Sequence, residues 1–311
     1  MTDAPEPELP RGIALAWGVA ANPQRGPKRE MSVERIVEAA VEIADAEGLG
    51  AVSMAAVASR LGFTPMSLYR YVSAKDDLIL LMQEEATGAP SDETRTAGGW
   101  RERLEALFRE QLQHYLRHPW VLEIPITGVP ATPNSAAWMD AGLSALAETP
   151  LTYEERLAVM LLVTGTAHWA GTIVAGYSRV EREQGLAPDA ISRNEDALFR
   201  ALITEDAYPE LRAAIESGVF LDDSDPFSFA LERGLDGVAA YIDAASEAAD
   251  DRRQRPRWLG LDDADIADDK RFREAQKAVR AAEKVLRDAR KLERQAAREA
   301  HERRARQTPS A

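Results

Sequence analysis

Residues 53–75 decide the fold of this chain, and they read SMAAVASRLGFTPMSLYRYVSAK. Ser53 can cap a short helix. That helix has apolar side chains at helical spacing, at Met54, Val57, Ala58 and Leu61. Gly62 then supplies a tight turn, and Thr64 starts a second helix with Pro65 at its first position, where a missing N–H costs nothing. Two short helices joined by a tight turn predict a helix-turn-helix.

The charge around this motif differs from that of the whole chain. The 311 residues include 52 acidic ones and carry a net charge of −14, yet residues 48–75 contain no Asp or Glu. The same window holds Arg60, Arg70 and Lys75. A surface free of acidic groups inside an acidic protein favours a local contact with phosphates rather than binding over the whole surface. With Leu68 facing inward, Thr64, Met66, Ser67 and Arg70 are available to base edges.

The motif and its flanks resemble the TetR/AcrR family of regulators. The residues that carry the resemblance form four short runs: RIVEAA at 35–40, EGL at 47–49, ASRLG at 58–62 and LYRYVSAKDDL at 68–78. The motif to which they belong covers about 55 residues. The region from Trp100 to Ala249 more loosely resembles the C-terminal domain of tetracycline-repressor-type members, including His118-Pro119-Trp120 at a helix end.

The resemblance implies a ligand-responsive regulator, usually a repressor. It would bind an inverted-repeat operator in double-stranded DNA as a two-fold homodimer and leave it when a small-molecule inducer binds. Tyr69 and Lys75 are then expected to contact phosphates. The full set of expected DNA contacts is Lys28, Arg29, Ser53, Thr64, Pro65, Met66, Ser67, Tyr69, Arg70 and Lys75. The basic run of Arg25, Lys28 and Arg29 could equally be a solvated stretch.

Helix-forming residues in long runs predict an all-α chain with four parts. We expect a flexible N-terminal arm over 1–27, a three-helix helix-turn-helix domain over 28–86, a larger helical domain over 100–249, and an extra charged, coiled-coil-like helix over 263–306. The resemblance implies that the domain over 100–249 binds the ligand and forms the dimer. Within the larger domain, helices are expected at 100–118, 134–148, 152–183, 192–204, 208–217 and 226–249.

Two helices of the larger domain have a pattern typical of a buried bundle. Residues 157–176 contain no charged residue, which also satisfies the length test for a membrane span, but a buried helix fits the threonines and glycines better. The resemblance implies that this helix and 226–249 form a dimerising four-helix bundle. The expected interface residues are Leu157, Leu161, Phe227, Leu231, Val238 and Ile242. An inducer pocket is expected at Tyr115, Trp138, His168 and Trp169.

Several function classes find no support in the sequence. The chain has no cysteine, and we find no nucleophile elbow, phosphate-binding loop or catalytic carboxylate pair, so no enzyme, metal or cofactor is expected. His114 and His118 have a metal-binding spacing but lack a third ligand. The acidic start of the chain is unlike a signal peptide, so a cytoplasmic location without membrane contact is expected. The alternative function is a helical scaffold that dimerises through C-terminal heptads.

The last sixty residues have a different composition. Residues 252–311 carry a net charge of +7, which leaves −21 for residues 1–251. Phe272, Val279 and Leu286 recur every seven residues, as do four alanines from Ala275 to Ala296. Three interpretations stay open: this helix extends the dimer, contacts DNA outside the operator core, or is simply solvated.

Overall fold

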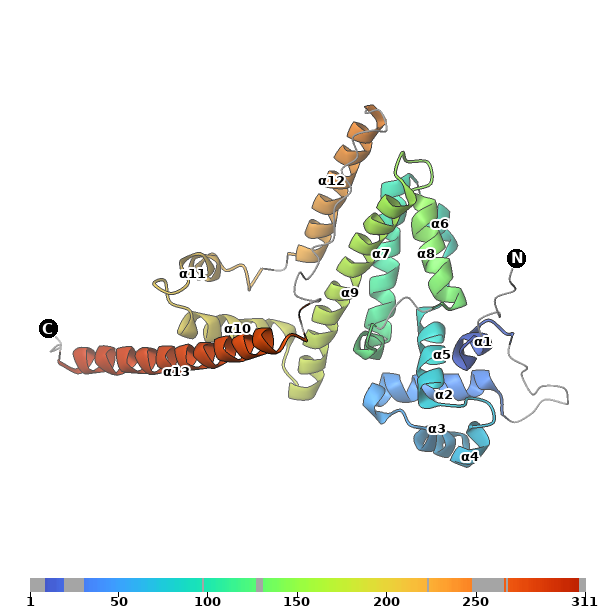
Figure 1. Cartoon of the computed structure of the whole chain (residues 1–311), viewed down its shortest axis with the longest axis horizontal. Helices are drawn as coiled ribbons and strands as arrows, with labels where there is room; N and C mark the ends of the chain where they lie inside the picture. The colour runs from blue at the N-terminus through green and yellow to red at the C-terminus, as the bar shows by residue number, and fades with distance from the viewer. Residues whose placement is uncertain are drawn as a thin grey trace. The chain divides into compact units, whose positions relative to one another are not determined.

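The computed structural model describes residues 9–19, 31–96, 98–126, 131–222, 224–247, 266 and 268–307, and every regular element among them is helical (Figure 1). The expected all-α class is therefore confirmed. The chain divides into two compact units, Met1–Ala248 and Ala249–Ala311.

The N-terminal module contains helices α2 (Val33–Glu47), α3 (Met54–Leu61), α4 (Pro65–Leu68) and α5 (Lys75–Thr87), with a 3₁₀ turn at Leu49–Ala51. Ser32 and Ser53 cap α2 and α3, because each hydroxyl accepts a hydrogen bond from the backbone N–H three residues on. Gly62 adopts the left-handed conformation, with φ of 75°, that turns the chain from α3 toward α4. The apolar faces meet in one core, whose most buried members include Ile36, Val57, Leu68, Val72 and Leu78.

The prediction that residues 1–27 form a flexible arm is wrong for part of this segment. Helix α1 (Arg11–Ala16) packs against α5, and the backbone N–H of Gly12 donates to Asp77 at 3.0 Å. A Cβ at Gly12 would lie 2.8 Å from that carboxylate oxygen and 3.3 Å from the Cα of Asp77, so a larger residue would force this contact to shift. A second contact is made by Trp17, whose indole N–H donates to the carbonyl of Ala131. Six residues are too few to show a helical period, which is why the sequence did not reveal α1.

The larger domain holds α6 (Asp92–Thr96), α7 (Trp100–Arg117), a 3₁₀ turn at Pro119–Glu123, α8 (Pro133–Ala145), α9 (Tyr153–Gln184), α10 (Pro188–Leu202), α11 (Pro209–Glu216) and α12 (Pro226–Glu247). The expected helices are present, with ends that shift by at most four residues, whereas α6 and the 3₁₀ turns were not predicted. Helices α7, α8, α9 and α12 share a second core around Leu104, Leu146, Val163 and Leu235.

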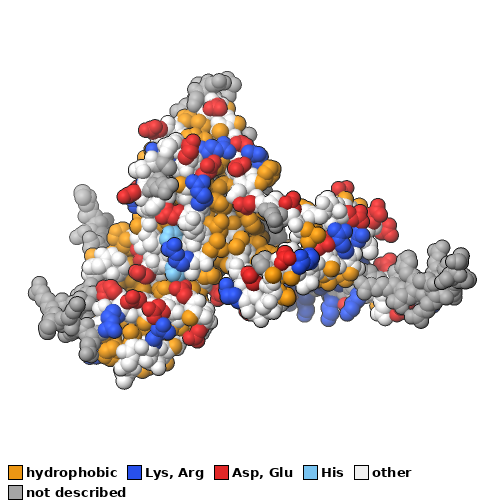
Figure 2. Space-filling model, turned by 180° about the vertical axis from the view of Figure 1, so that it is seen from behind, with side chains coloured by type: hydrophobic (Ala, Val, Ile, Leu, Met, Phe, Trp, Pro, Cys, Tyr) orange, Lys and Arg blue, Asp and Glu red, His pale blue; other side chains and the backbone are white. Residues whose placement is uncertain are grey.

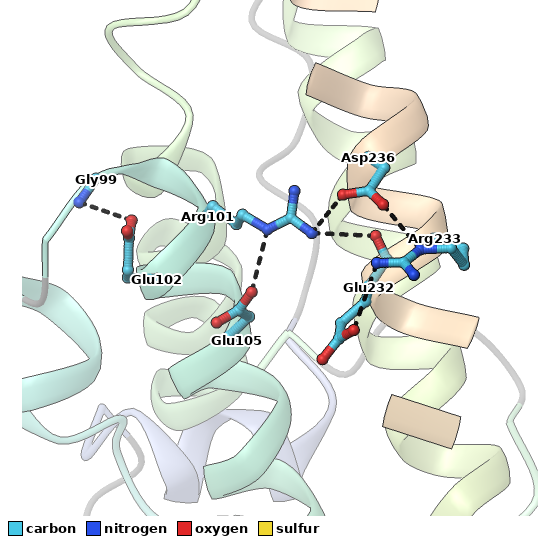
Figure 3. Close-up of polar contacts among 7 residues, drawn as sticks. All are labelled: Gly99, Arg101, Glu102, Glu105, Glu232, Arg233 and Asp236. Atoms are coloured by element: carbon cyan, nitrogen blue, oxygen red, sulfur yellow. Dashed lines mark hydrogen bonds and ion pairs between the residues drawn. The ribbon is translucent and has the colours of Figure 1, made fainter. Parts of the chain in front are cut away.

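Helix α12 is fixed to α7 by polar contacts as well as by this core (Figure 3). The Arg101 guanidinium on α7 donates to the Asp236 carboxylate at 2.7 Å and to the backbone carbonyl of Glu232 at 3.1 Å. The Arg101 hydrogen bond, together with nearby Arg233, lowers the pKa of Asp236. Close packing also joins α12 to α9, where Leu162 lies against Gly234.

Among the described residues, α9 is long and apolar enough to cross a membrane by length and composition alone. Of an 18-residue apolar stretch of this helix, 33% is buried. One helix of this kind is weak evidence for a span, since core helices of globular domains satisfy the same test. In the second unit, α13 (Lys270–Gln307) is a single helix of 38 residues.

Candidate nucleic-acid interface

Helix α4 presents a small outward surface on a rigid base. Leu68 and Val72 are fully buried, whereas Met66 is 76% and Tyr69 46% exposed. The side chains of Thr64, Pro65 and Arg70 are exposed on the same short segment. Burial of Leu68 therefore fixes the direction in which its neighbours point, which is the arrangement a groove-reading helix needs.

Helix α4 is short. It ends at Leu68, and Tyr69 is its C-cap. Thr64 lies at the N-cap position with Pro65 following it, but its side chain makes no capping hydrogen bond. Instead, the Ser67 hydroxyl donates to the Thr64 carbonyl at 2.5 Å.

Ser53, another expected DNA contact, already has a structural role. Its hydroxyl is half-buried and accepts a hydrogen bond from the Ala56 N–H. Ser53 therefore caps α3. A contact with DNA would have to be made by the same hydroxyl while it keeps this hydrogen bond.

The positive surface is narrower than the sequence suggested. Arg60 donates two hydrogen bonds, of 3.0 and 2.7 Å, to the same carboxylate oxygen of Glu42 on α2, so a carboxylate balances its charge. Arg70 and Lys75 are exposed and form no ion pair with any residue that the structure describes. Arg25, Lys28 and Arg29 lie outside the described residues.

A polar junction connects this module to the larger domain. The Asp45 carboxylate near the end of α2 lies 2.8 Å from Nδ1 of His118 and accepts a hydrogen bond of 2.7 Å from the indole N–H of Trp120. The Trp120 ring itself is buried in the core of the N-terminal module. No sequence pattern pointed to Asp45, because its partners lie more than seventy residues away along the chain.

The four residues expected at a ligand pocket do not form one group. Tyr115 of α7 and His168 of α9 meet edge to face with ring centroids 5.6 Å apart, and burial raises the pKa of Tyr115. Trp138 packs edge to face on His114 instead and donates to the Gly88 carbonyl. Trp169 is 59% exposed, on another face of α9, so it does not join Tyr115 and His168. Adjacent helical residues point about 100° apart, and the prediction overlooked this.

Gln111 is a residue that sequence reasoning missed. It lies one helical turn before Tyr115, and its side-chain oxygen is buried without a hydrogen-bond partner among the described residues. Such a group costs stability unless something satisfies it. Gln111, Tyr115 and His168 are therefore the best candidates for contacts with a ligand inside the domain.

The predicted interface residues divide into exposed and buried ones. Leu157 and Leu161 are exposed on α9, and Phe227, Val238 and Ile242 are half-buried on α12. Leu231 is only 3% exposed and belongs to the core of its own chain, so it is not available to a second copy in this arrangement.

Exposed apolar side chains continue along α9 to Trp169, and Figure 2 shows hydrophobic side chains gathered over this helix in the middle of one face. Gly165 and Gly176 add to this side of α9, and a Cβ on either would meet nothing within 4 Å. A large exposed apolar surface of this kind usually marks a contact with another molecule.

Comparisons with known proteins agree with these features. The family model described as bacterial regulatory proteins, tetR family, matches residues 36–82, and the model described as tetracyclin repressor-like, C-terminal domain, matches residues 90–242. The chain is 35% identical over 241 residues to the HTH-type transcriptional repressor DrrR1 of Streptomyces coeruleorubidus, covering 76% of this chain and 87% of that protein.

Two solved structures share the fold. Apo ActR from Streptomyces coelicolor aligns with a TM-score of 0.55 and 24% identity, and ActR in complex with actinorhodin aligns with a TM-score of 0.55 and 23% identity. Each alignment covers 72% of this chain and all of the ActR chain.

Proposed function

The chain belongs to the TetR family of DNA-binding transcriptional regulators, which are not enzymes, and from this premise we propose that it represses transcription as a ligand-released homodimer. Two copies would place their α4 helices in successive major grooves, about 34 Å apart, on an inverted-repeat operator. We place this activity in the cytoplasm, where operator DNA and a small-molecule inducer are both accessible.

The observation that carries the proposal is the outward surface of α4. Exposing 76% of an apolar side chain such as Met66 to water does not stabilise the fold. A base edge or a thymine methyl group would give this side chain an apolar contact. Thr64 and Arg70 add polar groups beside it, and Tyr69 and Lys75 lie where phosphate contacts would fix the register. We assign the base contacts to Thr64, Met66, Ser67 and Arg70 on this basis, with Pro65 adding apolar contact.

The exposed apolar face of α9 is proposed to hold the two copies together. Leu157, Leu161 and Trp169 supply its bulky side chains, and Gly165 allows the two backbones to approach closely. Helix α12 packs on α9 within each chain and completes the bundle at its edge through Val238 and Ile242.

The inducer is proposed to bind beside Gln111, Tyr115 and His168. A ligand hydroxyl could donate to the unsatisfied Gln111 oxygen while an aromatic ring packs against Tyr115 and His168. The related ActR fold is found in complex with actinorhodin in one solved structure, which supports a small-molecule site in this fold. Helix α7 leads from this cluster directly to His118 and Trp120, so a small shift of α7 would reach Asp45 and the DNA-binding module.

Selection of bound sequences from random DNA tests the proposal. We expect an inverted repeat whose half-sites lie one helical turn apart, bound by two chains. A screen of aromatic hydroxylated compounds against that site should then give ligands that release it, and Gln111→Leu should weaken their effect. Recovery of no preferred sequence, or binding by a single chain, would contradict the proposal.

A further inference from the structure

Helix α13 carries a continuous line of positive charge. Basic residues recur in steps of three and four, so that they lie on one face of a helix. They are Lys270, Arg273, Lys277, Arg280, Lys284, Arg287, Lys291, Arg294 and Arg298, which we call the basic stripe. The acidic residues between Lys270 and Arg298 all lie at other positions, so every position of the stripe is basic. The stripe is about 42 Å long at about 1.5 Å per residue.

The basic stripe is exposed and not neutralised by its own helix. Its members from Lys270 to Lys291 are all exposed. Where the structure describes side chains on α13, the ion pair joins Arg303 to Glu299, outside the stripe, and no stripe residue pairs with a carboxylate. Arg273 donates to the backbone carbonyl of Asp268. The side chains of Arg294 and Arg298 are not among those described.

This arrangement is unfavourable for a helix that has only water around it. Arg273 and Lys277 are four residues apart, and the same like-charge spacing is repeated in each of the next three heptads. Like charges at this spacing destabilise a helix, whereas alternating signs would have stabilised it. Bringing a polyanion to the stripe reverses the penalty, because each basic group then faces an opposite charge.

We propose that the basic stripe of α13 binds the phosphate backbone of duplex DNA outside the operator core. This inference rests on the proposed function, since it extends the contact that α4 begins. Duplex DNA presents phosphates every 3.4 Å along each strand, so the stripe is long enough to meet the backbone over about one helical turn. The opposite face of α13 is apolar, with an alanine every seven residues from Ala275 to Ala296 beside Phe272, Val279 and Leu286. A lipid surface is therefore the competing partner for this helix, and the test below includes vesicles for that reason.

The test compares two DNA duplexes and three full-length proteins. One duplex holds the selected operator core alone, and the other holds the same core with twenty base pairs of random sequence on each side. The proteins are the wild type, a variant with Arg273, Arg280, Arg287 and Arg294 replaced by Gln, and a control with the same four replaced by Lys. Circular dichroism checks that helix content is equal in all three.

On the longer duplex we expect the glutamine variant to bind at least tenfold more weakly at about 0.1 M salt. Its slope of log affinity against log salt should be shallower by up to about 0.9 for each phosphate that the variant no longer neutralises. The lysine control should retain both values, and on the core duplex all three proteins should bind alike. Equal salt slopes for the wild type and the glutamine variant on the longer duplex would overturn the proposal.

Other partners for the stripe give different results. If the glutamine variant loses binding to vesicles of phosphatidylserine and phosphatidylcholine but keeps its affinity for the longer duplex, the stripe binds membranes and the proposal is wrong. If all three proteins fail to bind the core duplex, the proposed function fails. In that case the comparison on the longer duplex still decides whether the stripe binds DNA.

Discussion

Met66 and Leu68 are two residues apart, and the structure separates them completely: one is largely in solvent and the other lies in the core. Helical spacing predicted this difference from the sequence. The pairing of Arg60 with Glu42 could not be predicted, because it depends on how α2 packs against α3. On α4, which residues face outward could therefore be predicted from the sequence, whereas which outward charges remain free could not.

Met66→Ala and Lys75→Ala should weaken operator binding in different ways. Removing an apolar contact with a base should cost about 1–3 kcal/mol on preferred sites and change the preferred bases. Removing a phosphate contact should weaken all sites to a similar degree and reduce the salt slope by about one. Binding measured on a panel of half-site variants at two salt concentrations checks both. If the two variants give the same sequence profile as the wild type at every position, Met66 does not read bases.

His114 should make the larger domain less stable in mild acid. Burial is the main cause that lowers the pKa of His114, although Glu110 opposes it at 4.0 Å. A lowered pKa in the folded state means that the unfolded chain takes up the proton first as the pH falls below about 6.5. Stability is then unaffected at high pH and decreases below about 6.5.

Denaturant unfolding at about pH 8, 6.5 and 5, values that bracket the ordinary histidine pKa, should show this decrease in the wild type. In His114→Gln the decrease should be smaller, since glutamine has no proton to gain. Parallel curves for the two proteins across the pH range would mean that His114 does not contribute to the pH dependence.

At the scale of elements, long helices with a clear period were predicted well and short ones were missed. The period of α9 and α12 extends over many turns, so the sequence placed both within two residues at each end. Helices α1 and α6 have six and five residues, and contacts such as that of Gly12 with Asp77 hold α1 in place rather than its own pattern. The face on which a residue lies was harder to predict, as Trp169 and Leu231 show.

The burial of Leu231 changes how the proposed dimer should be tested. Leu231→Glu would place a charge in the core of one chain, so dissociation of the dimer could simply follow from unfolding. Leu161→Glu and Trp169→Glu instead place the charge on the exposed face of α9. We expect both to give folded monomers that bind operator DNA at least tenfold more weakly.

Analytical ultracentrifugation measures the association, and circular dichroism confirms the helix content. Ala136→Glu, on the exposed side of α8, is the matched control and should stay dimeric. If the α9 variants remain dimers at micromolar concentration, the exposed face of this helix is not the interface.

At the scale of the whole first unit, the two cores meet at the end of α7. Tyr115 packs partly against both cores, and Trp120 lies in the core of the N-terminal module although it follows a helix of the larger domain. A second connection runs from α5 to α8, where Glu84 accepts from the backbone N–H of Asn134 at 2.7 Å. The DNA-binding module is thus attached to two different helices of the larger domain, and relative movement of those helices would rotate it.

Asp45 is the residue through which one of these attachments can be weakened selectively. Asp45→Ala removes the acceptor shared by His118 and Trp120 and leaves the buried Trp120 N–H without a partner, at a cost of about 1–3 kcal/mol. Coupling between two sites is reciprocal, so a looser junction should reduce the effect of ligand on DNA affinity and that of DNA on ligand affinity by the same factor.

The measurement is operator affinity with and without a releasing ligand, together with ligand affinity with and without operator. In Asp45→Ala both ratios should move toward one. Glu42 lies on α2 like Asp45, but Glu42→Ala breaks only the ion pair with Arg60 of α3 and leaves the junction intact. Both affinity ratios of this control should therefore match those of the wild type. If Asp45→Ala keeps the full wild-type ratios, the ligand signal reaches the DNA-binding module by another route, of which the contact between Glu84 and Asn134 is the next to test.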